Sequence, residues 1–353
     1  MTLQSAKILI IVRMDGQRSF RSARAILNRC SNDKNMIIDN KTIFIIGPTA
    51  VGKTELAINL ASAYGSEIIS ADSMQIYRSL DIGTAKPSKE QLSRVPHHMI
   101  DIVEPTDSFT VADYKAMAEE ITITLRENGI RPMIVGGTGL YINSLIYNMD
   151  FSGSGRIDGF REEYEELAEV HGNQYIYDIL ISKDPMAADK VHPNNRKRII
   201  RALERVEFGR EEEGLTEFKN SFEANPLYEP IIFLLTRERE ELIKRIDLRV
   251  DQIIEAGLEN EVKSLVDSGL SSSDISMLGI GYKEIIGYLS EEYDFDEAVR
   301  LIKRNTRRYA KRQMTWFRRY ENAHRIDLST SRNFDIALNE IIEIADANGI
   351  SLN

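Results

Sequence analysis

The amino-acid sequence predicts an α/β protein whose parallel sheet carries helices on both faces. Four short runs, over residues 42–46, 67–70, 132–135 and 231–235, are apolar and rich in β-branched residues, as buried strands are. Stretches with helical spacing of apolar residues separate them. Glycine-rich or acidic segments directly follow the first three runs, which is where α/β sheets place their chemistry.

The first predicted strand leads into a phosphate-binding pattern, G-x-x-x-x-G-K-[ST]. Its residues are Gly47, Pro48, Thr49, Ala50, Val51, Gly52, Lys53 and Thr54. Glycines let backbone amides converge on an anion, and the following helix adds partial positive charge at its N-terminus. Lys53 supplies a cation for phosphate oxygens, and Thr54 offers a hydroxyl to Mg²⁺. We therefore predict a P-loop nucleoside-triphosphate-hydrolase-like sheet that binds a diphosphate or polyphosphate.

Composition limits the class of protein further. The 353 residues carry a formal net charge of −10 and one cysteine, Cys30. A single cysteine excludes a disulfide framework and a cysteine-based zinc module, and it suits a reducing, cytoplasmic setting. Because no apolar run approaches the roughly 20 residues of a membrane helix, we expect no membrane partner.

Residues 1–40 are predicted to be an N-terminal extension. An apolar run over residues 6–12 precedes a basic segment that is poor in acidic residues. Mitochondrial transit peptides share this composition, but we favour a poorly ordered extension. Met36 lies just before the first strand, so a shorter natural start is plausible.

Asp72 follows the second predicted strand, beside the expected phosphate loop. A carboxylate at the C-terminal end of such a strand is well placed for chemistry. The alternative is that Asp72 only caps the next helix, since aspartate is a favoured N-cap residue. Both interpretations are open from the local sequence.

Two later motifs also allow more than one interpretation. His97 and His98 suggest a metal site, but no cysteine or third histidine lies nearby at ligand spacing, so we favour structural histidines. After the third strand, the glycines at 136, 137 and 139 permit close approach of backbone to a ligand. Thr138 faces either the same cleft as the phosphate loop or merely a tight turn.

The pattern of the chain changes after residue 150. Residues 151–155 resemble a hinge, and residues 156–215 show helical patterns and no convincing strand. The strand pattern returns at 231–235, so we predict a helical insertion at 151–225. This divides the α/β core into residues 41–150 and 226–330, followed by a C-terminal helix or tail at 331–353.

Basic residues gather in three segments. Within the insertion, Pro193 suits a helix start, and the cluster at 196–201 either grips phosphates or is ordinary surface charge. Thr236 is expected to cap an arginine-rich helix that runs to Glu255. The helix expected at 298–320 has arginines and lysines on one face, and no acidic residue lies between 300 and 319. In an acidic protein we interpret this stripe as a polyanion surface rather than a plain solvated face.

Seven motifs together resemble those of the tRNA dimethylallyltransferase family, also called tRNA isopentenyltransferase, of the bacterial type. They are GPTAVGKT at 47–54, SADSMQIYRSLDIGTAKPS at 70–88, PHHMIDI at 96–102, GGTGLY at 136–141, HPNN with RIIRALE at 192–204, GIGYKE at 279–284 and TRRYAKRQMTWFRR at 306–319. The resemblance covers nearly all of residues 42–320. Two departures are the N-terminal extension and the lack of a cysteine-based zinc finger.

This resemblance implies a reaction. Family members transfer a dimethylallyl group from dimethylallyl diphosphate to the exocyclic amine of the adenosine on the 3′ side of the anticodon, releasing diphosphate. The implied catalytic residues are Lys53 and Thr54, which hold the diphosphate with Mg²⁺, and Asp72, which is the general base. An adenylate isopentenyltransferase and a P-loop small-molecule kinase remain alternatives.

The resemblance also implies contacts with the anticodon stem-loop of tRNA. The implied positions are Asp72, Ser73, Met74, Gln75, Thr138, Arg161, Lys197, Arg198, Ile199, Ile200, Arg201, Met277, Gly279, Gly281, Tyr282, Arg307, Arg308, Lys311 and Arg312. We expect the target base to leave its stack to enter the cleft. The protein is expected to act as a monomer.

Overall fold

A computed structural model of the protein describes residues 39–149, 151, 159–208, 223–330 and 334–351. The expected N-terminal extension lies almost entirely outside these residues, as do most of the expected hinge at 151–155 and the segment 209–222. The four predicted strands are confirmed as β1 (Lys41–Ile46), β2 (Glu67–Ala71), β4 (Pro132–Gly136) and β5 (Glu229–Thr236).

The sheet has six strands, all parallel, in the order β3-β2-β4-β1-β5-β6. The additional strands are β3 (His97–His98) and β6 (His324–Asp327) at the two edges. Both are short and partly polar, so they lack the apolar signal that revealed the central strands. The P-loop type of α/β fold predicted from the sequence is confirmed.

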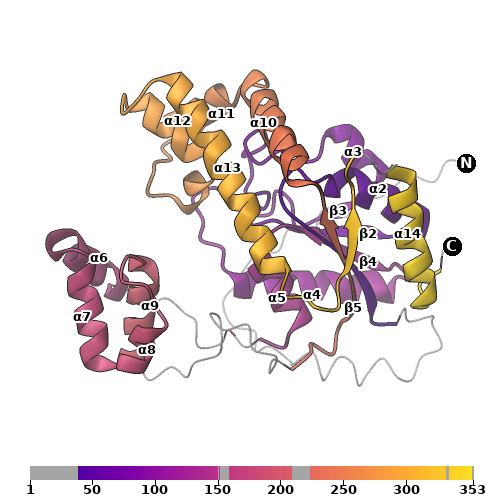
Figure 1. Ribbon diagram of the computed structural model, residues 1–353, viewed down its shortest axis with the longest axis horizontal. Helices are drawn as coiled ribbons and strands as arrows, with labels where there is room; N and C mark the ends of the chain where they lie inside the picture. The colour runs from indigo at the N-terminus through magenta and orange to yellow at the C-terminus, as the bar shows by residue number, and fades with distance from the viewer. Residues whose placement is uncertain (1–38, 150, 152–158, 209–222, 331–333, 352–353) are drawn as a thin grey trace, which may run out of the picture. The chain divides into compact units, whose positions relative to one another are not determined.

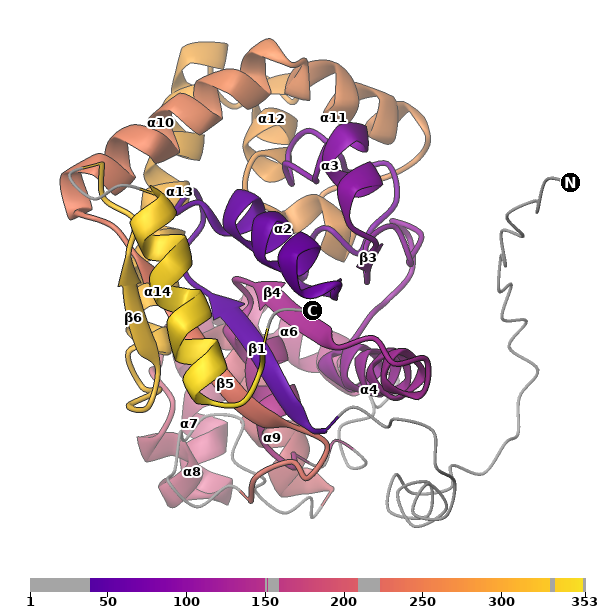
Figure 2. The same cartoon turned by 90° about the vertical axis from the view of Figure 1, so that its right-hand side faces the viewer.

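Alternate residues of the central strands enter two cores. On one face, Ile43 and Ile45 pack with α2 (Lys53–Tyr64) and the C-terminal helix α14 (Phe334–Ala347). On the other face, Phe44 and Ile46 pack with α4 (Val111–Glu127) and α5 (Gly139–Ile146). Figure 2 shows β1 between these layers. Period-two alternation in a parallel sheet buried on both sides produces this arrangement.

Several helix ends follow the expected capping chemistry. Ser88 closes a capping box on α3 (Lys89–Arg94), Thr110 does the same on α4, and Gly65 ends α2 in the left-handed conformation.

Two of the predicted helix starts were wrong. Thr236 is not a helix cap but the last residue of β5, where its hydroxyl donates to the carbonyl of Ile326.

The helix after β5 is α10 (Arg239–Glu255), with Glu238 at its N-cap. Pro193 also does not begin a helix: α9 (Arg196–Glu207) starts three residues later, because the side chain of Asn195 accepts the N–H of Arg198. The three helices before α9 are α6 (Phe160–His171), α7 (Asn173–Lys183) and α8 (Pro185–Asp189).

Helices α6 to α9 have a hydrophobic core of their own. Inside this core, the fully buried carboxylate of Glu204 forms ion pairs with Arg161 at 2.9 Å and with Arg201 at 2.8 Å. The segments that lead into and out of this insertion are bonded to each other. Tyr147 and Ala224 form an antiparallel bridge, and the N–H of Asn148 donates to the carbonyl of Glu223 at 2.8 Å.

A last group of helices covers the segment after β2. It consists of α10, α11 (Leu258–Asp267), the 3-10 turn η2 (Ile275–Leu278), α12 (Tyr282–Leu289) and α13 (Phe295–Phe317). Their shared core includes Ile76, Tyr77 and Leu80 from that segment. Figure 1 shows α13 running from this helical group toward the sheet. In the part of the chain that is described, no helix combines the length and apolarity needed to cross a membrane.

Candidate active site

The phosphate loop joins β1 to α2 with the geometry that its glycines predict. Gly52 has a φ of 117°, in the region that favours glycine, and Ala50 also has a positive φ of 62°. The ammonium of Lys53 donates to the carbonyls of Gly47 at 3.0 Å and Pro48 at 2.9 Å. Its cation therefore lies against the carbonyls of the loop that is predicted to bind an anion.

Burial lowers the pKa of Lys53 from 10.5 to about 8. The negative charge of Asp72 opposes this shift, and the positive charge of Arg249 adds to it. The free lysine therefore loses its proton near pH 8 and is still mostly charged at pH 7. The charges of Asp72 and Arg249 both act on the ammonium of Lys53, so the charge state of each of the three side chains affects the other two.

The capping role considered for Asp72 is partly confirmed. Its Oδ1 accepts the N–H groups of Met74 at 2.9 Å and Gln75 at 3.3 Å, but the segment is a turn and no helix follows it directly. Asp72 also lines a cavity of about 50 Å³ together with Lys53 and Thr54. The same carboxylate therefore holds a turn and faces the phosphate loop, and the two interpretations do not exclude each other.

The glycine-rich loop after β4 faces this site rather than being only a tight turn. The N–H groups of Gly137 and Thr138 both donate to the carbonyl of Ala71, at 3.2 and 3.0 Å. The hydroxyl of Thr138 accepts the N–H of Ser73 at 3.0 Å. Thr138 is thereby fixed beside the turn that contains Asp72.

A glutamine of α13 connects the two loops. Gln313 Oε1 accepts the N–H of Thr49 at 2.9 Å, and its Nε2 donates to the carbonyl of Gly137 at 2.9 Å. In the sequence, Gln313 falls on the same sector of the 298–320 helix as Ile302, Tyr309, Trp316 and Tyr320, so only its polarity distinguished it from a packing residue.

Arginines of the α10 region contact the phosphate loop from another side. The guanidinium of Arg237 donates to the carbonyl of Val51 at 3.3 Å, and that of Arg245 donates to the carbonyl of Ala50 at 3.0 Å. Burial lowers the pKa of Arg249, and the charge of Asp72 opposes that shift. The pattern of charges in the sequence did not establish these contacts.

The basic stripe of α13 is only partly available to a ligand. Arg300 pairs with Glu297, Lys303 pairs with Asp251 at 2.6 Å, and Arg307 pairs with Asp247 of α10. The acidic partners of Lys303 and Arg307 come from another helix, so the stripe looked unpaired in the sequence. Arg308, Lys311 and Arg312 are exposed.

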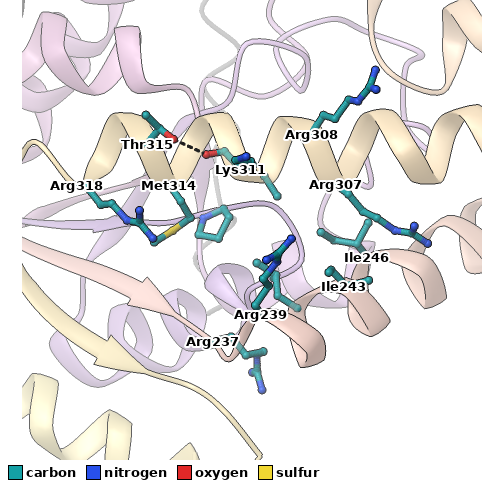
Figure 3. A pocket seen from close by; sticks show the side chains of 13 residues that line it. Arg237, Arg239, Ile243, Ile246, Arg307, Arg308, Lys311, Met314, Thr315 and Arg318 are labelled. Carbon is teal, nitrogen blue, oxygen red and sulfur yellow. Dashed lines mark hydrogen bonds between the residues drawn. The ribbon is translucent and has the colours of Figure 1, made fainter.

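A groove of about 620 Å³ separates α10 from α13 beside Pro48. Its apolar floor includes Ile243, Ile246 and Met314, and cations surround it (Figure 3). These cations are Arg237, Arg239, Arg307, Arg308, Lys311 and Arg318. Positive charge around an apolar groove suits a phosphorylated ligand with an uncharged part.

Of the residues in the insertion that were expected to contact RNA, some have exposed side chains and others are buried. Lys197 and Arg198 are exposed, whereas Ile199 and Ile200 are buried in the core of the insertion and offer no side chain to a ligand. Arg161 and Arg201 pair with the buried Glu204, which gives each a structural partner. Helical periodicity explains the division, because consecutive residues point to different faces.

The expected RNA contacts in the segment 277–282 also differ in exposure. The side chains of Met277 and Tyr282 are buried, and the hydroxyl of Tyr282 donates to Glu261 at 2.6 Å. Gly279 is partly exposed and Gly281 is buried. A Cβ atom at Gly279 would lie 2.7 Å from Cε of Met74, so the flexible end of that side chain would have to shift.

The paired histidines have structural partners. Nδ1 of His97 lies 2.8 Å from the carbonyl of Val95, and His98 Nε2 lies 2.6 Å from Glu67. Within the described ranges, no group of three or more histidines, cysteines, aspartates or glutamates is arranged to hold a metal ion. A magnesium ion at this site would therefore depend on Thr54, with oxygens supplied by the phosphorylated ligand.

Comparison with protein families gives two matches. Residues 75–320 match the family model described as IPP transferase, and residues 40–105 match the model described as isopentenyl transferase.

Named relatives agree with these models. The chain is 50% identical over 297 residues to a tRNA dimethylallyltransferase of Alkaliphilus metalliredigens, covering 84% of this chain and 94% of the relative. It is 46% identical over 300 residues to a tRNA dimethylallyltransferase of Clostridioides difficile, covering 85% and 96%.

Solved structures are similar as well. A tRNA isopentenylpyrophosphate transferase from Bacillus halodurans matches with a TM-score of 0.65 and 41% identity, covering 88% of this chain and 96% of that one. A eukaryotic dimethylallyltransferase acting on tRNA matches with a TM-score of 0.72 and 26% identity, covering 89% and 81%.

The lowered pKa of Lys53 predicts how anion binding depends on pH. Inorganic diphosphate stabilises the ammonium form, so its affinity should fall about tenfold per pH unit above pH 8, where the free lysine loses its proton. Titration calorimetry from pH 7 to 9.5 measures this. A Lys53→Arg variant stays charged and is the control for the ionisation of diphosphate itself. If the ratio of the two affinities did not change with pH, the assignment would be wrong.

Proposed function

Because the chain belongs to the tRNA dimethylallyltransferase family, we propose that it transfers a dimethylallyl group from dimethylallyl diphosphate to the exocyclic amine of the adenosine 3′ to the anticodon in tRNA. The observation that carries this proposal is the meeting of Lys53, Thr54 and Asp72 at one cavity. An anion site and a carboxylate base at the same place suit a displacement that releases diphosphate. The family of the chain supplies the identity of the transferred group and of the acceptor.

The phosphate loop would stabilise the leaving group. As the allylic C–O bond breaks, negative charge grows on the diphosphate, and Lys53, which lies against the loop, would neutralise part of it together with backbone N–H groups of the loop. Thr54 would hold Mg²⁺ together with diphosphate oxygens, and the ion would supply additional charge neutralisation. Arg249 adds a further positive charge near Asp72.

Asp72 would act as the general base. The adenosine amine forms a bond to the allylic carbon, the C–O bond to diphosphate breaks, and the proton released from nitrogen moves to the carboxylate of Asp72. An aromatic amine is a poor base, so this proton leaves during or after the attack. Oδ1 of Asp72 is occupied by the N–H groups of Met74 and Gln75, which fixes the carboxylate for this transfer.

The RNA would lie along the exposed cations. Arg308, Lys311 and Arg312 on α13 suit the phosphate backbone, as do Lys197 and Arg198 on α9. The target adenosine must leave its stack to reach Asp72, which costs less in a loop than in a duplex. Neither a free-nucleotide acceptor nor a kinase reaction would use these cations. That the protein acts in the cytoplasm and as a monomer stays a prediction from the sequence.

The decisive experiment uses the purified protein, Mg²⁺, dimethylallyl diphosphate and tRNA that lacks the modification. Mass spectrometry of the digested nucleosides should show an adenosine heavier by one dimethylallyl group in place of a hydrogen. Digestion into oligonucleotides should place it on the 3′ side of the anticodon. A pool of tRNA without prenylated adenosine would refute the proposal.

Substitution of Asp72 separates its two roles. Asp72→Asn keeps an acceptor for the turn but cannot take a proton, so transfer should slow by about 10²- to 10⁴-fold with both substrates still bound. Asp72→Ala also loses the contacts of the turn and should additionally reduce thermal stability. Single-turnover rates and melting temperatures distinguish these effects. Transfer at the normal rate in Asp72→Asn would exclude a base at this position.

The salt dependence of tRNA affinity tests the RNA surface. Replacing Arg308 and Lys311 with alanine should reduce the slope of log affinity against log salt by roughly 0.7 to 0.9 for each lost phosphate contact. Arg300→Ala is the matched control, because Arg300 lies on the same helix but pairs with Glu297. Filter binding between 50 and 300 mM salt measures the slopes. Equal slopes in the double variant and the wild type would place the RNA elsewhere.

A further inference from the structure

Helix α13 has an exposed basic face and a buried face that contacts the site. Arg308, Lys311 and Arg312 are exposed on it, whereas Gln313 is 6% exposed and bonds to both the phosphate loop and the loop after β4. A residue on the proposed RNA-binding helix thus holds the proposed diphosphate-binding loop. Such a helix is able to connect events at the two sites.

A chain of hydrogen bonds runs from the phosphate loop to the turn that carries Asp72. The N–H of Thr49 donates to Gln313 at 2.9 Å, and Gln313 donates to the carbonyl of Gly137 at 2.9 Å. The hydroxyl of the next residue, Thr138, accepts the N–H of Ser73 at 3.0 Å. Gln313 and the 136–139 loop supply these links, so the donor and acceptor parts of the site share one network.

Close packing leaves this network little freedom. A Cβ atom at Gly137 would lie 2.4 Å from Nε2 of Gln313, and one at Gly139 would lie 2.4 Å from the ring of Trp316. Helix α13 therefore lies directly against the backbone of the 136–139 loop. A displacement of the helix must move that loop or break the bonds, because packed interiors do not deform continuously.

The phosphate loop is held at three consecutive residues from the helical layer. Gln313 binds the N–H of Thr49, Arg245 binds the carbonyl of Ala50, and Arg237 binds the carbonyl of Val51. Among the contacts of the described residues, Gln313 is the one of these three side chains that also bonds the 136–139 loop, at the carbonyl of Gly137. A movement of that loop or of α13 would therefore reach the phosphate loop through Gln313.

From these contacts we propose that Gln313 is a positioning residue that couples tRNA binding to diphosphate binding, with each ligand strengthening the other. The inference rests on the proposed function, because it takes α13 and Thr138 as the acceptor side. RNA held against α13 fixes that helix, and Gln313 then fixes the amide of Thr49 in the loop. Coupling between two sites is reciprocal, so diphosphate raises the affinity for tRNA by the same factor.

The test measures the affinity for inorganic diphosphate with Mg²⁺, with and without a saturating tRNA transcript, by titration calorimetry on the full chain. In the wild type, tRNA should tighten diphosphate binding by about fivefold or more. Gln313→Met has a similar length but neither hydrogen bond. Its coupling ratio should fall to about one, while its affinity for tRNA alone is unchanged.

Steady-state kinetics supply a readout that a purely structural role would not give. In Gln313→Met, KM for dimethylallyl diphosphate should rise about tenfold while kcat at saturating donor stays within about twofold, since the reacting groups are intact. Thr306→Ala is the matched control on α13, because among the described residues that hydroxyl bonds the carbonyl of Ile302 in its own helix and reaches neither loop. Its coupling ratio and KM should equal those of the wild type.

A second variant covers the case in which Gln313→Met does not fold. Gln313→Glu keeps the size of the side chain and an acceptor for Thr49, but it cannot donate to Gly137. Its charge weakens diphosphate binding equally with and without tRNA and therefore does not change the ratio. Because the bond to Gly137 is lost, the coupling ratio should again fall to about one. A wild-type ratio of one, or a wild-type ratio in either variant, overturns the inference. If the wild type still prenylates tRNA, the proposed function survives that outcome; failure of prenylation overturns the function instead.

Discussion

The parallel direction of the strands is the constraint on which the site depends. Because β1, β2 and β4 are neighbours that run the same way, the segments that follow them emerge at one edge of the sheet. The phosphate loop, the Asp72 turn and the 136–139 loop are those three segments. Their bonds to one another, such as those from Gly137 and Thr138 to Ala71, then need only short side chains and backbone groups.

Electrostatics explains why this edge is suited to a reaction. Lys53 is buried enough to lose much of its preference for the proton, yet Asp72 opposes that loss. A bound anion would hold the lysine in its charged form without a large rearrangement of solvent, which is the condition for preorganised stabilisation. The arginines that contact Ala50 and Val51 hold the loop carbonyls, so the same helical layer supplies both charge and rigidity.

Local signals were sufficient for the central strands and the phosphate loop, since each depends on neighbours in sequence. Long-range pairing was not readable. The partners of Lys303 and Arg307 lie about 50 to 60 residues away on α10, so the stripe looked freer than it is. Likewise, no local pattern revealed that Gln313 crosses to Thr49.

The joint between Tyr147 and Ala224 has a consequence for the architecture of the chain. The backbone enters and leaves the four-helix bundle through two segments that are already hydrogen-bonded side by side. Joining them with a short turn would leave the order of the sheet strands intact, and the bundle has its own apolar centre. The described helices between α5 and β5 are therefore a modular appendage, one that could be exchanged for another small domain without redesign of the sheet.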